Sequence, residues 1–186
     1  WCERAYTPAP DMEAILRERG LPLFKNESKV ASAAMDVSGF TLQSELTYTN
    51  ILNAIDLADI PLRTKDRDES HPLTMAGGPS VFNPEPLAPF IDFFVVGEGE
   101  DAIVEIAELL RTMKTNTRRE KLEALAKIEG VYVPELYPME TMPDGRILPK
   151  VDAPKIVKRI VQNLDGATFP VNYVVPYTQQ VHDRVG

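Results

Sequence analysis

The stretch Ile91–Glu100, IDFFVVGEGE, decides the fold. Six mostly apolar residues run into a glycine-rich loop, and a helical pattern follows at once. An uninterrupted run of Ile, Phe and Val is typical of a strand buried on both faces, as in parallel sheets covered by helices. The glycines permit a sharp turn and the close approach of a ligand. Because ligands of open α/β sheets lie at the carboxyl ends of the strands, this loop is a candidate binding element.

Two other stretches repeat this arrangement. Leu73–Pro79, LTMAGGP, is a short apolar strand that ends in a glycine pair, and Val37–Leu42, VSGFTL, is a strand with a polar exit. Apolar residues at helical spacing follow in 48–58 and in 100–113. This alternation of strands and helices predicts an α/β fold with a doubly wound parallel sheet over residues 1–115. We expect the three strand exits to lie side by side and to form a binding crevice.

Residues 116–186 have a different character, and we predict a mixed, irregular C-terminal extension. Thr117 and Glu120 form a capping-box pattern at the start of a helix. Pro143–Arg146 is typical of a hairpin turn between two short strands. Residues 171–176 are rich in β-branched side chains, which predicts an extended segment. The extension is therefore expected to lead away from the sheet domain.

The composition of the chain limits the classes of function that it can have. Of the 186 residues, 44% are hydrophobic and 26% are charged, as is ordinary for a soluble globular domain. The net charge of −8 argues against nucleic acid as a partner. No apolar stretch approaches the ~20 residues of a membrane helix and no signal peptide is visible, so we expect a cytoplasmic protein without a membrane partner. One cysteine, Cys2, excludes an intrachain disulfide and a multi-cysteine metal site. Both ends resemble cut ends, which indicates a piece of a longer protein.

The motifs favour binding over catalysis. The loop Gly97–Glu100 lacks GxGxxG spacing and carries acids where a dinucleotide would present its pyrophosphate, and no P-loop motif occurs. Neither His71 nor His182 belongs to a recognisable catalytic or metal-binding motif. The basic stretch 115–121 is expected to be a solvated face. The pair Gly77–Gly78 either closes a tight turn or lies against a ligand.

Polar side chains also stand at the start of two helical patterns. Four polar residues follow a predicted strand, and they either bind a ligand or cap the helix that comes next: Thr41, Gln43, Ser44 and Glu45. Glu100 and Asp101 precede the other helix. At the start of that helix, a favourable interaction of the two carboxylates with the helix dipole is a simpler role than catalysis.

Four segments carry a family resemblance: DVSGFTLQSELTYTNILNAIDLADIPLR, HPLTMAGGPSVFNPEPLAPFIDFFVVGEGED, VYVPELY and VPYTQQVHDRVG. They resemble the cobalamin-binding-like N-terminal domains of radical S-adenosylmethionine (radical SAM) proteins, often labelled Fe-S oxidoreductases. The resemblance covers nearly the whole chain, and the QSELTYTN and VHDR segments indicate one subfamily. It implies a Rossmann-like or flavodoxin-like fold, with residues 116–186 as a linker toward a missing radical SAM barrel.

The resemblance also implies cofactors. In that family a CxxxCxxC motif holds an iron–sulfur [4Fe–4S] cluster, which cleaves S-adenosylmethionine to a 5′-deoxyadenosyl radical. The motif is absent here, so the resemblance places the cluster and S-adenosylmethionine in the missing part of a parent protein. It implies cobalamin at the carboxyl ends of the strands, although the DxHxxG loop whose histidine coordinates cobalt in some members is also absent.

By position, Thr41 matches the serine or threonine after one strand, and Gly77 and Gly78 match the glycine pair that lines the channel for the nucleotide tail. The cofactor-binding residues that we predict are Thr41, Gln43, Ser44, Gly77, Gly78, Pro79, Ser80, Gly97, Glu98 and Gly99. We assign no catalytic or metal-ligating residue.

The expected function is that of the N-terminal domain of a radical SAM Fe-S oxidoreductase, which holds cobalamin, or a degenerate form of that site, against the radical centre. Its expected partners are its own missing C-terminal radical domain and an unknown substrate. The alternative is a non-catalytic scaffold that docks a substrate or a partner protein.

Overall fold

The computed structural model describes residues 2–167, and its centre is a four-stranded sheet in the order β1-β2-β3-β4. The first three strands run parallel, and β4 runs antiparallel to β3. The α/β class is therefore confirmed, but the sheet is mixed where the sequence predicted a parallel one. The strands are β1 (Val37–Thr41), β2 (Leu73–Gly77), β3 (Phe93–Val95) and β4 (Val131–Tyr132).

The register of the sheet places three strand exits in one line. Thr41 at the end of β1 pairs with Gly77 at the end of β2, and Gly77 pairs with Val95 at the end of β3. The loops that follow these strands therefore begin next to one another, as the sequence predicted. We call this side of the sheet the carboxyl edge, and the side where the parallel strands begin the amino edge.

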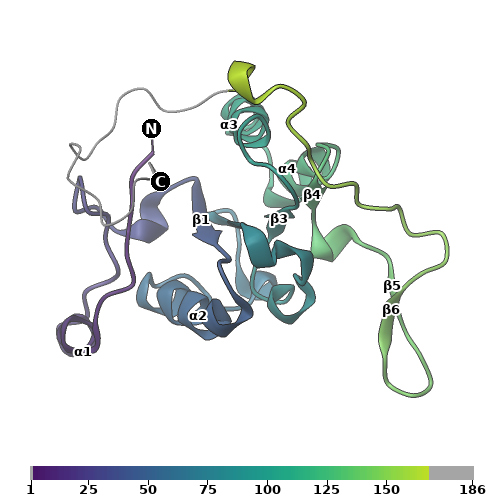
Figure 1. The fold of residues 1–186 in the computed structure, drawn as a ribbon. Helices are drawn as coiled ribbons and strands as arrows, with labels where there is room; N and C mark the ends of the chain where they lie inside the picture. The colour runs from purple at the N-terminus through teal and green to yellow at the C-terminus, as the bar shows by residue number, and fades with distance from the viewer. Residues whose placement is uncertain (1, 168–186) are drawn as a thin grey trace.

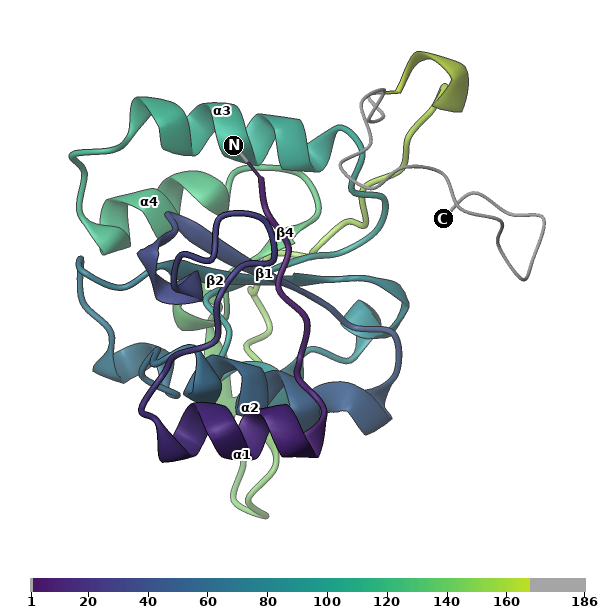
Figure 2. The ribbon, with the colours of Figure 1, turned by 90° about the vertical axis from the view of Figure 1, so that its left-hand side faces the viewer.

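Helices cover both faces of the sheet (Figure 2). Apolar residues of α2 pack on one face, whereas those of α3 and α4 pack on the other. In β3, Phe94 belongs to the first cluster and Phe93 to the second, and neither side chain is exposed to solvent. This alternation confirms a strand that is buried on both sides. The helices are α1 (Pro10–Glu18), α2 (Tyr48–Leu57), α3 (Ala102–Thr112) and α4 (Arg118–Leu125).

The capping box predicted for α4 is present. The Glu120 backbone N–H donates to Thr117 Oγ1 at 3.3 Å, and the Thr117 backbone N–H donates to Glu120 Oε2 at 2.8 Å. Two backbone donors that the helix itself leaves unpaired are thus satisfied. The bond from the Thr117 backbone N–H lowers the pKa of Glu120, because it stabilises the ionised carboxylate.

The residues after β4 leave the sheet and later return to it. The predicted hairpin forms from β5 (Met139–Thr141) and β6 (Ile147–Pro149), and it projects away from the sheet (Figure 1). The chain then comes back to the carboxyl edge, where Arg159 makes a parallel bridge with Gly97. The predicted boundary between residues 115 and 116 stays a prediction, although β4 beyond it pairs with β3. The extended segment predicted at 171–176 lies outside the described residues.

Candidate binding groove

An open groove of about 1030 Å³ lies at the carboxyl edge, between the exits of β2 and β3. Its volume is at the upper end of the roughly 300–1,000 Å³ that is usual for small-molecule sites. We call it the carboxyl-edge groove. Six of the predicted cofactor-binding residues line it, three from each exit loop: Gly77, Gly78, Pro79, Gly97, Glu98 and Gly99.

The other four predicted residues, Thr41, Gln43, Ser44 and Ser80, do not line the groove. Ser44 acts as a cap, because its Oγ accepts a hydrogen bond from the Leu46 backbone N–H at 3.3 Å. Ser80 donates its backbone N–H to the Leu42 carbonyl at 2.9 Å. Thr41 and Gln43 are exposed.

The glycine pair after β2 packs against the exit of β1. Gly78 has φ +111°, and a Cβ there would lie 3.0 Å from the Leu42 carbonyl oxygen and 3.1 Å from the Leu42 nitrogen. The Leu42 N–H also donates to the Gly77 carbonyl at 2.7 Å. The space that a side chain would fill at Gly78 is therefore taken by the protein's own backbone.

The space beside Gly97, the glycine after β3, is also taken by backbone of the chain itself. Gly97 has φ +106°, and a Cβ there would lie 2.6 Å from the Arg159 nitrogen and nearer still to its carbonyl oxygen. We call residues 157–161 the strap. Its Arg159 N–H donates to the Val96 carbonyl at 2.8 Å, and the Glu98 N–H donates to the Arg159 carbonyl at 3.0 Å. Gly130, with φ +87°, makes room for Arg159 from the other side.

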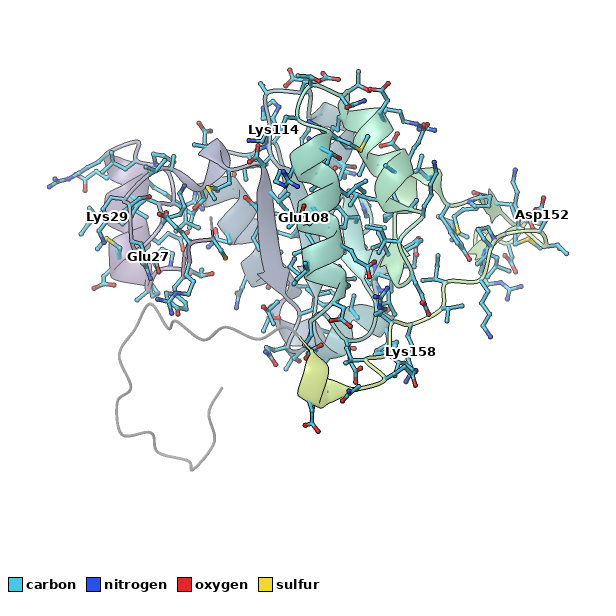
Figure 3. All side chains as sticks on the ribbon, turned by 90° about the horizontal axis from the view of Figure 1, so that it is seen from above. Glu27, Lys29, Glu108, Lys114, Asp152 and Lys158 are labelled. Atoms are coloured by element: carbon cyan, nitrogen blue, oxygen red, sulfur yellow. The ribbon has the colours of Figure 1, made fainter. Side chains whose placement is uncertain are left out.

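Charged side chains also hold the strap. The Arg159 guanidinium pairs with Glu105 on α3, and this hydrogen bond raises the pKa of Arg159. The Val161 N–H donates to Glu98 Oε2. Lys158 lies beside the end of α3 that is opposite Lys114, which is the end where the β3 exit loop enters the helix (Figure 3). The strap therefore forms one wall of the groove.

The groove is predominantly apolar between these polar loops. Several of its apolar side chains are open to solvent, with 64% of Phe82, 45% of Ile103 and 48% of Ile160 exposed. Contiguous exposed apolar surface rimmed by polar groups is typical of an interaction site. Among them lies Glu100, whose Oε2 atom is buried and receives no hydrogen bond from any described residue.

A buried ionic network lies at the amino edge, and the sequence analysis missed it. Asp92 Oδ2 accepts hydrogen bonds from Arg67 Nη1 at 3.0 Å, from Arg118 Nη2 at 2.6 Å and from the Thr74 N–H at 2.7 Å. The expectation of a solvated face over 115–121 was wrong for Arg118, whose side chain is only 12% exposed. Burial lowers the pKa of Arg67. The network joins the loops before β2 and β3 to α4, so its role is structural.

The remaining chemistry-bearing residues form no cluster that could hold a metal. Within residues 2–167 no group of three or more His, Cys, Asp or Glu side chains comes together in that way. Cys2 is a free, exposed thiol. His71 contacts Asp68 through Nδ1 at 2.8 Å, whereas His182 lies outside the described residues. Over the same described range, every helix is too short or too polar to cross a membrane.

The fold and the groove define an α/β domain with a candidate binding groove between strand-exit loops. Residues 1–134 match the family described as radical SAM proteins, N-terminal, and the chain belongs to this family. Membership confirms the coarser part of the resemblance and suggests S-adenosylmethionine and a [4Fe–4S] cluster in the parent protein. Neither a curated protein nor a solved structure matches the chain.

Proposed function

We propose that this chain is the N-terminal docking domain of a radical SAM Fe-S oxidoreductase, and that its carboxyl-edge groove packs against the radical domain of the parent protein. The cluster and S-adenosylmethionine would belong to that radical domain. One observation carries the proposal: the groove is open and apolar, yet the spaces beside its glycines are filled by the chain itself.

Cobalamin fits this arrangement poorly. A corrinoid of the kind that the resemblance implies needs a channel beside the glycine pair for its nucleotide tail. Beside Gly78 that space holds the Leu42 backbone, and beside Gly97 it holds the strap. His71 lies before β2 at the amino edge, on the side of the sheet away from the groove. The alternative of a non-catalytic scaffold that docks a partner is therefore the better supported.

The course of the chain supports the radical domain as the occupant. The family match is to the N-terminal part of radical SAM proteins, which supports the proposal that the radical domain follows this chain in the parent protein. The strap and the residues up to 167 lie beside Asp101 and Glu129, at the same end of α3 as the groove. Because the two domains would belong to one chain, a short flexible linker between them would give an effective concentration on the order of millimolar.

The apolar lining supplies the driving force for docking. Removing apolar surface from water contributes about 25 cal/mol per Å², and large aromatic anchors contribute the most to interfaces. Phe82 is the largest exposed apolar side chain in the groove, so it is the expected anchor.

Phe82→Asp in the parent protein tests the proposal. Loss of an aromatic anchor costs about 2 kcal/mol of docking free energy. We therefore expect the ratio of docked to undocked protein to fall on the order of 30-fold. Hydrogen–deuterium exchange at residues 95–103 measures docking, because the radical domain would shield the amides that line the groove. Val151→Asp is the matched control, since Val151 is fully exposed and lies outside the groove.

Wild-type parent protein should exchange these amides more slowly than the chain alone. Phe82→Asp should restore the rate of the chain alone, and Val151→Asp should not. Equal exchange in the wild-type parent protein and in the chain alone would rule out docking through this groove.

A further inference from the structure

The face of β1 that belongs to the side of α3 and α4 is left open. Val37 packs on the core of these two helices, and Gly39 and Thr41 share its face because strand residues alternate between faces. A Cβ at Gly39 would lie 3.1 Å from Met75 Cε, which packs on the same core. Gly39 and Thr41 are nevertheless exposed, and Figure 3 shows β1 beside α3 with no described helix over it.

The flank of α3 next to this face is apolar and exposed as well. Ile103, Ala107 and Leu110 recur at helical spacing and share one flank. Ile103 lines the carboxyl-edge groove with Met75, and Leu110 lines a pocket of about 230 Å³ with Asp36 at the amino edge, so this flank faces β1 and β2. Ile103 is 45% exposed, and Ala107 is also exposed. We call this surface, Gly39 and Thr41 with the α3 flank, the open β1 face.

We propose that the open β1 face holds an amphipathic helix of the parent protein, contributed by a segment outside this chain. Parallel strands occur almost only in sheets that helices cover on both faces. On the other face of β1, Phe40 packs on the core that contains α2, so only one face has its cover. β1 is also an edge strand, since β2 is its only partner among the described strands. An open face and an open edge at the same strand indicate that the sheet domain continues beyond β1 in the parent protein.

The dimensions of the open β1 face fit one helix. β1 has five residues and α3 has eleven, and at about 3.3 Å per strand residue and 1.5 Å per helix residue each spans about 16 Å. A helix of about three turns would therefore run beside α3 along the whole of β1. The missing side chain at Gly39 and the small one at Ala107 leave room for the side chains of that helix.

Charge favours one direction for the helix. α2 and α3 both follow the exit of a strand, so they begin at the carboxyl edge. A third helix built in this way would end at the amino edge, where Lys114 and Lys121 line the pocket. Among the described residues, neither lysine has an ion pair or a hydrogen bond, although Asp36 and Glu69 line the same pocket. Cations stabilise the C-terminal end of a helix, because its unpaired carbonyls carry partial negative charge.

Cysteine labelling tests whether the open β1 face is covered in the parent protein. The thiol of Ala107→Cys, in a Cys2→Ser background, should react rapidly with N-ethylmaleimide in the chain alone. In the parent protein we expect this reaction to be at least about tenfold slower, because the thiol is reached only when the helix opens locally. Mass spectrometry of the labelled peptide reads the position. Glu108→Cys is the matched control, since Glu108 is exposed on α3 and labelled on its outer side in Figure 3. It should react equally in both proteins.

Photo-cross-linking then identifies the cover. Benzophenone maleimide on Ala107→Cys in the parent protein should cross-link to residues spaced about three or four apart in one segment outside this chain. The same reagent on Ile103→Cys should reach the N-terminal part of that segment, and on Lys114→Cys its C-terminal part. The reverse order would overturn the direction that the two lysines favour.

The outcomes separate this inference from the docking proposed for the groove. Equal labelling of Ala107→Cys in the chain alone and in the parent protein would overturn it. Protection that Phe82→Asp abolishes would assign the cover to the docked radical domain, against a helix of its own. Protection of the chain alone that grows with protein concentration would identify a second copy and also overturn it. Protection that persists in Phe82→Asp supports the helix, whether or not the groove docks the radical domain.

Discussion

Asp92→Asn is expected to lower the free energy of unfolding of the chain by about 3–5 kcal/mol. The Asp92 side chain is 2% exposed and is the shared partner of Arg67 and Arg118. The Arg67 side chain is fully buried, so removal of the carboxylate leaves a buried guanidinium without a counter-charge. Because a domain has only about 5–15 kcal/mol of net stability, this loss brings the chain close to unfolding.

Urea denaturation measures this effect, with Asp144→Asn as the control. The Asp144–Arg146 pair is exposed on both sides, and such pairs contribute about 0–1 kcal/mol. We expect the control to stay within about 0.5 kcal/mol of the wild type. A loss below about 1 kcal/mol for Asp92→Asn, similar to that of a surface ion pair, would contradict the structural role of the network.

Gly97→Ala is expected to have the next largest effect, because it combines backbone strain with a steric clash. A residue with a Cβ at a left-handed conformation costs about 1–2 kcal/mol. At Gly97 the new Cβ would also overlap the backbone of Arg159, which cannot yield as a flexible side chain would. The strap must then leave the sheet edge and lose its two backbone hydrogen bonds to Val96 and Glu98.

Gly145→Ala provides the control for the strain alone. Gly145 has φ +85°, and nothing lies within 4 Å of the Cβ position. We expect Gly97→Ala to cost at least about 2 kcal/mol more than Gly145→Ala in urea denaturation, since two backbone hydrogen bonds at about 1 kcal/mol each are lost in addition. Limited proteolysis should also cut the strap faster only in Gly97→Ala. Equal costs for the two variants would show that the strap does not depend on Gly97.

Much of the sheet domain could be predicted because its signals are local. The run of apolar residues before Gly97 identified β3, and the alternation of Phe93 and Phe94 between two cores follows from the period of a strand. The alignment of the exits at Thr41, Gly77 and Val95 follows from parallel pairing. The same signals led to the choice of the six predicted cofactor-binding residues that line one groove.

What lies against Gly78 and Gly97 could not be predicted, because a glycine motif does not indicate which part of the chain, or which ligand, packs against it. At Gly97 the answer is Arg159, which lies far along the chain, beyond the hairpin of β5 and β6. At Gly78 it is the Leu42 backbone, where the register of two strands decides the contact. A resemblance to cofactor-binding loops therefore located the groove, but it could not tell what lies against the glycines.

The amino-edge network escaped prediction for a related reason. Arg118 stands in a basic stretch that is typical of solvated faces, and only its position on α4 relative to β3 buries it. The sequence did contain one signal of a buried ion pair. Asp92 interrupts an apolar run, and a carboxylate at the start of a buried strand requires a buried donor. The local pattern did not indicate which cationic side chain would donate to Asp92.

The most direct test of the account is a cobalamin titration of the chain, followed by gel filtration and visible spectroscopy of the protein peak. Because the chain's own backbone fills the spaces beside Gly78 and Gly97, we expect a colourless protein peak. Stoichiometric co-elution of cobalamin with a shifted corrin spectrum would contradict it, and would make the carboxyl-edge groove a corrinoid site.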